Sequence, residues 1–238
     1  MRFAEWAGLA ARAEGWLLPG ACLLCEEPAG AGSPLACALC QSRWRRLPAP
    51  WCERCGQPSL HPAAPCRMCP GWPDGLTRVR SAVWLDDLAR EAVHALKYQG
   101  WQRIAEPMAA TMTRLEPLRS EHVLVPVPLS PRRLRTRGYN QAEMLARALS
   151  RLTDLPCRTD LLQRVRETGT QTALAPEARR ANIAGAFIGR DVAGTRLVLV
   201  DDVLTTGATL AESAEALLEA GAACVEAITF ARARVPIE

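Results

Sequence analysis

The hydrophobic and polar positions of this chain follow two periods in its last two thirds. Residues 76–85 alternate in the manner of a strand, and residues 87–98 repeat apolar side chains at helical spacing. A second helix is expected over residues 102–115. Further strands are expected near 122–127, 157–162, 185–188, 196–200 and 224–231, and further helices over 139–152 and 208–220. Strands that alternate with helices predict an α/β fold, with a parallel sheet flanked by helices.

The segment 198–209, VLVDDVLTTGAT, combines a buried strand with a polar loop. Its apolar run ends at Asp201 and Asp202, and Thr-Thr-Gly follows before a helix-forming stretch. The backbone N–H groups of residues 205–209 would be unpaired donors at the start of that helix, and Gly207 permits close approach of a ligand. A phosphate group is the ligand expected there.

The two carboxylates predict what lies next to that phosphate. Asp201 and Asp202 are too close to a phosphate to bind it themselves, so they should face ribose hydroxyls or a metal-bound water. In this order of elements the segment resembles the phosphoribosyl pyrophosphate (PRPP) motif of type I phosphoribosyltransferases. The resemblance implies a PRPP site formed by Asp201, Asp202, Thr205, Thr206, Gly207, Ala208 and Thr209.

Other proteins also place acids after a strand. A Walker B strand needs a G-x-x-x-x-G-K-[ST] loop elsewhere, and the chain has none. An ordinary strand, turn and helix with capping Asp and Thr side chains explains the elements but not the whole motif.

The composition divides the 238 residues into two parts. All seven Trp lie at or before residue 101, and eight of the ten Cys lie between Cys22 and Cys69. We therefore expect a small module over residues 1–75, made of an N-terminal amphipathic helix and a double zinc ribbon. A phosphoribosyltransferase-like domain is expected over residues 76–238.

Four C-x-x-C pairs occur in the small module. Each pair can place two thiolates on one cation, and two successive pairs complete the tetrahedral shell that structural zinc prefers. Sequential pairing predicts one site from Cys22, Cys25, Cys37 and Cys40 and another from Cys52, Cys55, Cys66 and Cys69. Disulfides and an iron–sulfur cluster are the alternatives. A segment this rich in Pro, Gly and Arg should need metal in order to fold.

Two basic stretches follow, and both suit an anionic ligand. Residues 125–141 contain Arg132, Arg133, Arg135 and Arg137, whose guanidinium groups match pyrophosphate oxygens, although at least one of them should be simply solvated. Residues 164–187 are expected to form either a mobile lid or an ordinary surface loop.

The net charge of +4 is unevenly spread, since residues 120–182 hold eleven Arg and six acids. Such a basic region could meet pyrophosphate, a nucleotide or a nucleic-acid backbone. No apolar run approaches the length of a membrane-spanning helix, and the charged N-terminus is unlike a signal peptide. We therefore expect a cytoplasmic protein.

Four segments in a fixed order carry a wider resemblance. VPVPLSPRRLRTRGYNQ, RVRETGTQTAL, ARRANIAGAF and VLVDDVLTTGAT resemble the ComF family, phosphoribosyltransferase-like proteins linked to DNA uptake and natural competence. HALKYQG at residues 94–100 and the cysteine pairs extend the resemblance over nearly the whole chain. It implies magnesium-dependent transfer of phosphoribosyl from PRPP to an acceptor that the motifs do not identify, a nucleobase being one candidate.

If the protein is an enzyme, the resemblance assigns a role to each part of the site. Asp201 and Asp202 would bind ribose hydroxyls, while magnesium would bridge pyrophosphate and ribose oxygens. Pyrophosphate would be bound by Arg132, Arg133 and Arg137, and Lys97 could reach either the acceptor or the pyrophosphate.

Two other functions stay open. One is a non-catalytic adaptor that retains a PRPP pocket and holds single-stranded DNA or a DNA-uptake translocase on its zinc ribbons and arginines. The other is a purine-salvage or amidotransferase-like enzyme with a different acceptor. The sequence has no N-terminal nucleophilic Cys for glutamine hydrolysis, which disfavours the amidotransferase.

Overall fold

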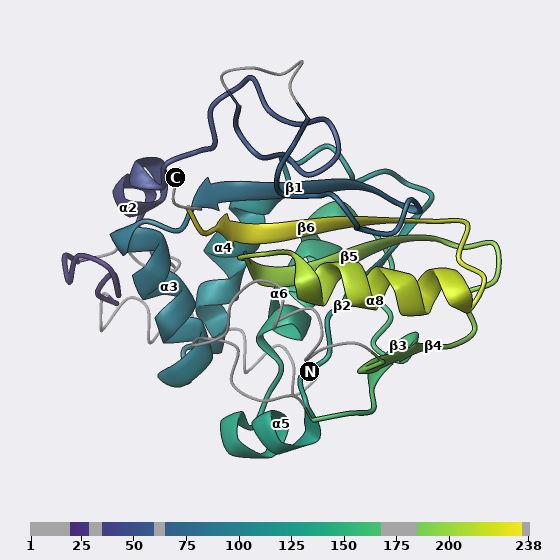
Figure 1. The fold of residues 1–238 in the computed structure, drawn as a ribbon. Helices are drawn as coiled ribbons and strands as arrows, with labels where there is room; N and C mark the ends of the chain where they lie inside the picture. Colours follow the sequence, from purple (N-terminus) through teal and green to yellow (C-terminus); the bar gives the residue numbers. More distant parts are fainter. Residues whose placement is uncertain (1–19, 29–34, 60–64, 168–184, 235–238) are drawn as a thin grey trace.

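The computed structural model describes residues 20–28, 35–59, 65–167 and 185–234 (Figure 1). Two predicted features lie outside these residues: the N-terminal amphipathic helix, and residues 168–184 of the stretch for which a lid is expected. Within the described ranges, no helix is long and apolar enough to cross a membrane.

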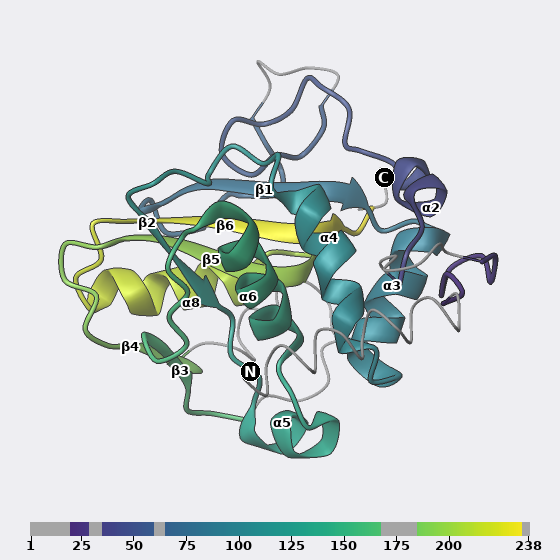
Figure 2. The ribbon, with the colours of Figure 1, turned by 180° about the vertical axis from the view of Figure 1, so that it is seen from behind.

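A four-stranded parallel sheet forms the centre of the molecule (Figures 1 and 2). Its strand order is β1 (Leu76–Trp84), β6 (Cys224–Arg232), β5 (Arg196–Leu204) and β2 (His122–Pro126). The side chains of residues 197–200 in β5 are all fully buried, as expected for an inner strand that is covered on both faces. The predicted α/β fold is therefore confirmed.

Helices cover both faces of this sheet (Figures 1 and 2). One apolar core contains side chains from α3 (Asp87–Tyr98), α4 (Ala105–Met112) and α6 (Gln141–Thr153), and a short 3₁₀ turn, η1 (Gln102–Ile104), leads into α4. The opposite core contains side chains from α8 (Ala208–Glu219). Alternate residues of β5 enter the two cores, because side chains of a strand point to opposite faces.

The strands expected near 157–162 and 185–188 form a different structure. A two-stranded antiparallel sheet pairs β3 (Leu162–Arg164) with β4 (Phe187–Gly189). In the segment expected as a strand near 157–162, Cys157 makes an isolated parallel bridge to Leu124 of the central sheet. Pro156 precedes it and has no N–H group with which to extend a ladder.

The arginine-rich segment forms the short helix α5 (Pro131–Arg137), an element that the sequence analysis does not predict. Ser130 caps the helix by accepting a hydrogen bond from the Arg133 N–H group at 3.4 Å, and Pro131 occupies its first turn. Gly138 ends the helix with a φ of 80°. These start and stop signals are present in the sequence, next to the run of charges.

Strand β5 continues through Leu204 instead of ending at Val200. The reason is its neighbour β6, which keeps pairing with it: Asp201 lies opposite Thr229, and Leu204 lies opposite Arg232. The acid pair therefore belongs to the strand, and the loop begins only at Thr205.

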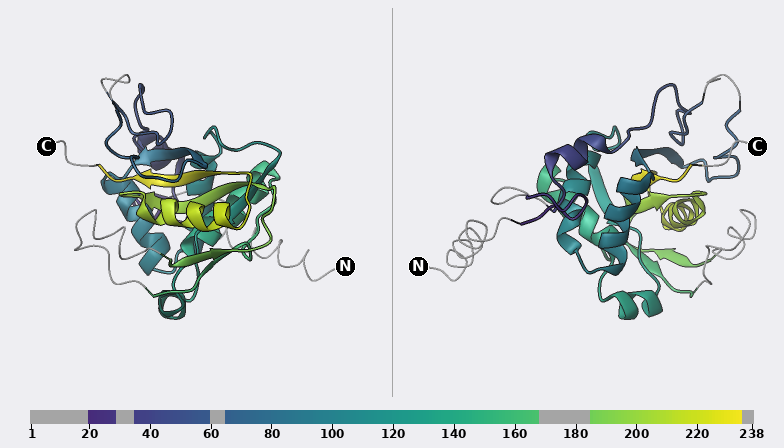
Figure 3. Two further views of the ribbon diagram at one scale, coloured as in Figure 1. Left: turned by 45° about the vertical axis from the view of Figure 1, so that its right-hand side comes forward. Right: turned by 90° about the vertical axis from the view of Figure 1, so that its left-hand side faces the viewer.

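Two cysteine modules, which contain Cys22 to Cys40 and Cys52 to Cys69, pack against β1: the first lies past the carboxyl end of the strand beside α3, and the second lies along its outer edge (Figures 1 and 3). The first contains the helix α2 (Ala38–Arg43), and its Arg45 carbonyl accepts a hydrogen bond from the Trp84 N–H group at 2.7 Å. In the second module the Arg54 carbonyl accepts from the Val79 N–H group at 2.7 Å. The modules thus pair with edge groups of β1 that could otherwise recruit another chain.

Candidate functional site

Eight cysteines form two groups of four. They are Cys22, Cys25, Cys37 and Cys40, and Cys52, Cys55, Cys66 and Cys69, as sequential pairing predicts. Within each group the sulfur atoms all lie within 4.8 Å of one another, and the Cys25–Cys37 and Cys52–Cys69 sulfur distances are 3.8 Å. This arrangement fits a structural zinc ion with four thiolate ligands, which leaves no open position for catalysis.

Backbone N–H groups point at several of these sulfurs. Cys22 Sγ accepts from the N–H groups of Leu24 at 3.4 Å and of Cys37 at 3.3 Å. Burial opposes ionisation of this thiol, but these donors lower the pKa of Cys22 to about 7. Such donors stabilise thiolate charge and hold the ligands in place.

The loop after β5 has the form of a phosphate-binding turn. Gly207 lies in the left-handed region with a φ of 78° and directly precedes α8. Gly207 has no side chain to cap the helix, and the Ala208 N–H group makes only a long contact with Thr206 Oγ1, at 3.5 Å, which a ligand at this helix start could replace. The partial positive charge at this helix start favours an anion.

The acid pair beside this loop is asymmetric. Asp202 is 2% exposed and forms an ion pair with Lys97 of α3. It also accepts a hydrogen bond from Gln141 Nε2 at 3.2 Å, whereas Asp201 Oδ1 accepts from the Asp202 N–H group at 2.8 Å. Asp202 is therefore already neutralised by a side chain of the protein.

The two carboxyl groups differ in acidity for the same reason. Burial, together with the adjacent Asp202 carboxylate, raises the pKa of Asp201 well above its usual range. Burial also opposes ionisation of Asp202, but the Lys97 ammonium group outweighs it and lowers the pKa of Asp202. Burial similarly opposes the charge of Lys97, and Asp202 more than compensates, so that the pKa of Lys97 is raised.

A cavity of about 370 Å³ joins these parts. Of the residues that the sequence analysis assigns to the site, those lining the cavity are Lys97, Arg133, Asp201, Asp202, Thr205 and Thr209. Its volume lies in the range of pockets that hold small molecules. Candidate residues from α3, α5 and the end of β5 are thus brought around one space.

The other assigned residues do not line this cavity in the described part of the chain. Arg132 is exposed, and its N–H group donates to Glu167 Oε1 at 2.7 Å. Arg137 donates to the Gln141 side chain and lies 5.3 Å from the centre of the Tyr98 ring. Thr206 and Gly207 lie in the loop before α8, and Ala208 is the first residue of that helix.

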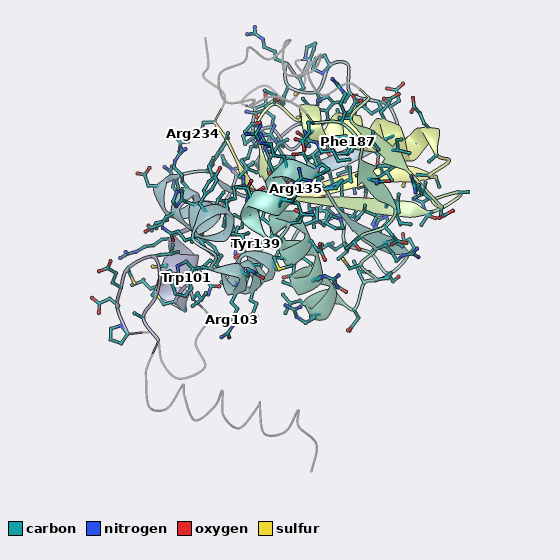
Figure 4. All side chains as sticks on the ribbon, turned by 90° about the horizontal axis from the view of Figure 1, so that it is seen from below. Trp101, Arg103, Arg135, Tyr139, Phe187 and Arg234 are labelled. Atoms are coloured by element: carbon teal, nitrogen blue, oxygen red, sulfur yellow. The ribbon has the colours of Figure 1, made fainter. Side chains whose placement is uncertain are left out.

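The structure adds lining residues that the sequence analysis does not assign to the site. Arg164 comes from β3, is 7% exposed, and lies 5.3 Å from the ring of Phe187, which is labelled in Figure 4. His94 and Tyr98 come from α3, one helical turn apart, with ring centres 5.1 Å apart. Their helical spacing is visible in the sequence, but only the packing of α3 turns this face toward Asp201.

Tyr139 attaches the arginine-rich segment to α3. Its hydroxyl donates a hydrogen bond to the Leu96 carbonyl, next to Lys97 (Figure 4). Asn140 then caps α6 by accepting from the Ala142 N–H group at 3.1 Å, and its side-chain amide donates to the Val127 carbonyl at 3.0 Å. The sequence GYNQ therefore positions both α5 and the Gln141 side chain.

Comparison with known proteins defines the class. Residues 134–237 match the family model of the phosphoribosyl transferase domain. The parallel sheet, the glycine turn before α8 and the two four-cysteine groups together define a phosphoribosyltransferase-like protein with a double zinc-ribbon module.

Individual relatives define the family. The chain is 35% identical to the DNA utilization protein YhgH of Escherichia coli K12, over 88% of this chain and 95% of that protein. It is 31% identical to Competence protein F of Haemophilus influenzae, over 83% and 90% of the two chains. Competence protein ComFC of Bacillus subtilis is 32% identical, over 82% and 83%. The chain belongs to the ComF family, as the sequence motifs predict.

Proposed function

We propose that this protein binds PRPP with magnesium and transfers its phosphoribosyl group to an acceptor, in a process linked to DNA uptake. The observation that carries the proposal is that Thr205 and Thr209, on either side of the glycine turn, line one cavity together with Asp201 and with the basic side chains of Arg133 and Arg164. The names of the relatives, a DNA utilization protein and two competence proteins, support the link to DNA.

Each part of PRPP has a matching group in the site. The 5-phosphate would accept hydrogen bonds from backbone N–H groups of residues 205–209 and from the hydroxyls of Thr205 and Thr209. Ribose hydroxyls would donate to Asp201, which lines the cavity. Magnesium favours carboxylate and phosphate oxygens, and when bound it would neutralise charge on the pyrophosphate.

The basic side chains would act on the leaving group. Arg133 and Arg164 lie on the cavity wall, and their guanidinium groups could bind the pyrophosphate oxygens as the bond from C1 of the ribose breaks. Arg137 is turned toward Gln141 and Tyr98, so its proposed role becomes indirect: it orients the Gln141 side chain. Lys97 holds Asp202 in its ionised form.

Calorimetric titration of the full chain with PRPP, with and without magnesium, tests this function. We expect saturable binding that requires magnesium and that is abolished when both Asp201→Asn and Asp202→Asn are introduced. Asp160→Asn is the matched control, because Asp160 is an exposed acid that pairs only locally with Arg158. Unchanged PRPP affinity in the Asp201 and Asp202 variant, with its fold intact, would contradict the proposal.

A second candidate function is the nucleic-acid-associated adaptor. A separate cavity of about 280 Å³ has Arg46, Trp51, Arg80 and Arg114 in its lining, together with Glu116, which pairs with Arg80 at 3.3 Å. Guanidinium groups beside the half-buried indole of Trp51 could hold a phosphate backbone and a stacked base. Salt-dependent binding of single-stranded DNA that is lost on Arg46→Ala and Arg114→Ala would favour it. Absence of DNA binding at low salt would count against it.

A further inference from the structure

Trp72 packs directly against the glycine of the phosphate-binding turn. Trp72 is 4% exposed, and a Cβ atom added to Gly207 would lie only 2.2 Å from its Cζ2 atom. Real Cβ atoms do not approach carbon so closely, so the indole occupies the space that any other residue at position 207 would need. The six-membered ring of Trp72 therefore forms one wall of the turn.

The second cysteine group holds Trp72 in this position. The backbone N–H group of Trp72 donates to the backbone carbonyl of Cys69, one of the candidate zinc ligands, at 3.3 Å. Arg54, which lies between Cys52 and Cys55, donates from Nη2 to the carbonyls of Trp72 at 3.0 Å and Pro73 at 2.6 Å. Both C-x-x-C pairs of this group thus contact the backbone around Trp72.

A second connection runs through Arg232, which is fully buried at the end of β6. Its Nη1 donates to the Cys55 carbonyl at 2.7 Å, and its Nε donates to Gln57 Oε1 at 2.9 Å. Arg232 lies opposite Leu204 in the sheet, the residue directly before the turn. The second cysteine group is therefore connected to the turn through Trp72, and through Arg232 to β6, the strand that pairs with the end of β5 just before the turn.

The first cysteine group provides an internal comparison. Its tryptophan, Trp44, is also buried, at 3% exposed, and also follows a C-x-x-C pair. Trp44 packs edge-on against Phe230 with ring centres 4.9 Å apart, in the core on the other face of the sheet from α8. The two tryptophans therefore lie in different cores: Trp44 packs against Phe230 on one side of the sheet, whereas Trp72 lies in the core on the α8 side and packs against Gly207.

We propose that the second cysteine group, acting through Trp72, sets the conformation of the turn at residues 205–207, so that PRPP binding requires metal in that group. Trp72 is then a positioning residue for the phosphate. This inference rests on the proposed PRPP site.

The physical reason is the freedom of Gly207. Glycine populates both signs of φ, so the turn needs an outside contact to keep the left-handed conformation that aims its N–H groups at one point. A four-cysteine module is folded only when its metal is bound. Loss of that metal would release Trp72 and let the N–H groups diverge, and misplacement by about 1 Å is enough for a large loss of function.

Matched tryptophan variants of the full chain test the role of Trp72. We expect Trp72→Phe to weaken PRPP binding at least about tenfold while the protein retains two zinc ions per chain. Trp44→Phe should lower thermal stability and leave PRPP affinity unchanged. Gly207→Ala should weaken binding less in the Trp72→Phe background than in the natural protein, because the smaller ring leaves room for the new methyl group. Equal PRPP affinities for all these variants would overturn the inference.

Variants that remove the metal from one cysteine group at a time distinguish this inference from the proposed function. Cys66→Ser should disrupt the second group and Cys25→Ser the first. We expect amide hydrogen exchange of residues 205–210 to rise in Cys66→Ser but not in Cys25→Ser. If the natural protein binds no PRPP and this difference appears, the proposed function fails and the coupling stands. If PRPP binds and both variants keep full affinity and slow exchange, the coupling is wrong.

Discussion

The ammonium group of Lys97 in α3 forms an ion pair with the buried carboxylate of Asp202 in β5. Gln141, at the start of α6, donates a further hydrogen bond to the same carboxylate. Three elements that are distant in sequence therefore meet at the acid pair. Because Lys97 already neutralises Asp202, Asp201 is the acid of this pair that can serve a ligand in the cavity.

Removing the charge of Lys97 should destabilise the protein most at neutral pH. Lys97→Met leaves Asp202 buried without its counter-charge, and breaking such a pair costs about 3 kcal/mol. Urea-induced unfolding at neutral and mildly acidic pH measures the effect. Lys97→Met combined with Asp202→Asn is the control, and it should recover most of the lost stability.

The sign of the pH dependence follows from the pKa of Asp202. With Lys97 present this pKa is lowered, so the stabilisation persists above the pKa of an unfolded Asp and is lost only as the pH falls through the lowered value. Without Lys97, burial should raise the pKa of Asp202. The difference in unfolding free energy between the natural protein and Lys97→Met should then become smaller as the pH falls through that raised pKa. If Lys97→Met were destabilised equally at neutral and at mildly acidic pH, the ion pair with Asp202 would not be the source of the lost stability.

Two adjacent arginines should differ in their effect on PRPP binding. Arg133 lines the cavity, whereas Arg132 is exposed on the surface of α5. Arg133→Ala should weaken PRPP binding about tenfold, since it removes a charge-assisted hydrogen bond to the pyrophosphate. Arg132→Ala should change affinity little and serves as the control for overall charge. Calorimetry decides the matter, and equal losses would indicate that only net charge matters.

Removing zinc should expose the edge of the sheet. Chelation of both groups would unfold the modules that pair with β1, and we expect the melting temperature to fall by about 10 °C or more, with aggregation. Cys157→Ser and Cys224→Ser are controls, because these two cysteines lie outside both groups. They should retain two zinc ions per chain by metal analysis. A chelated protein that melts at the original temperature would show that metal does not support these modules.

Features set by neighbouring residues can be predicted from the sequence. Periodic apolar positions predict β5 and α8, and the C-x-x-C spacing predicts the two cysteine groups, because strands, helices and knuckles form from local geometry. The cap signals of Ser130, Pro131 and Gly138 are local as well, so α5 could have been predicted from them. The extension of β5 could not, since it depends on continued pairing with β6.

The sequence by itself therefore determined most of the elements of the central sheet and its helices, the spacing of the cysteines and the glycine turn before α8. Only the tertiary structure decided that Lys97 neutralises Asp202, that Arg133 rather than Arg132 faces the cavity, and that Trp72 lies against Gly207. The physical reason is the distance along the chain over which each kind of interaction acts. Hydrogen bonds and periodicity within an element act over a few residues, whereas the face that each element turns toward the site is set by burial of apolar surface over the whole chain.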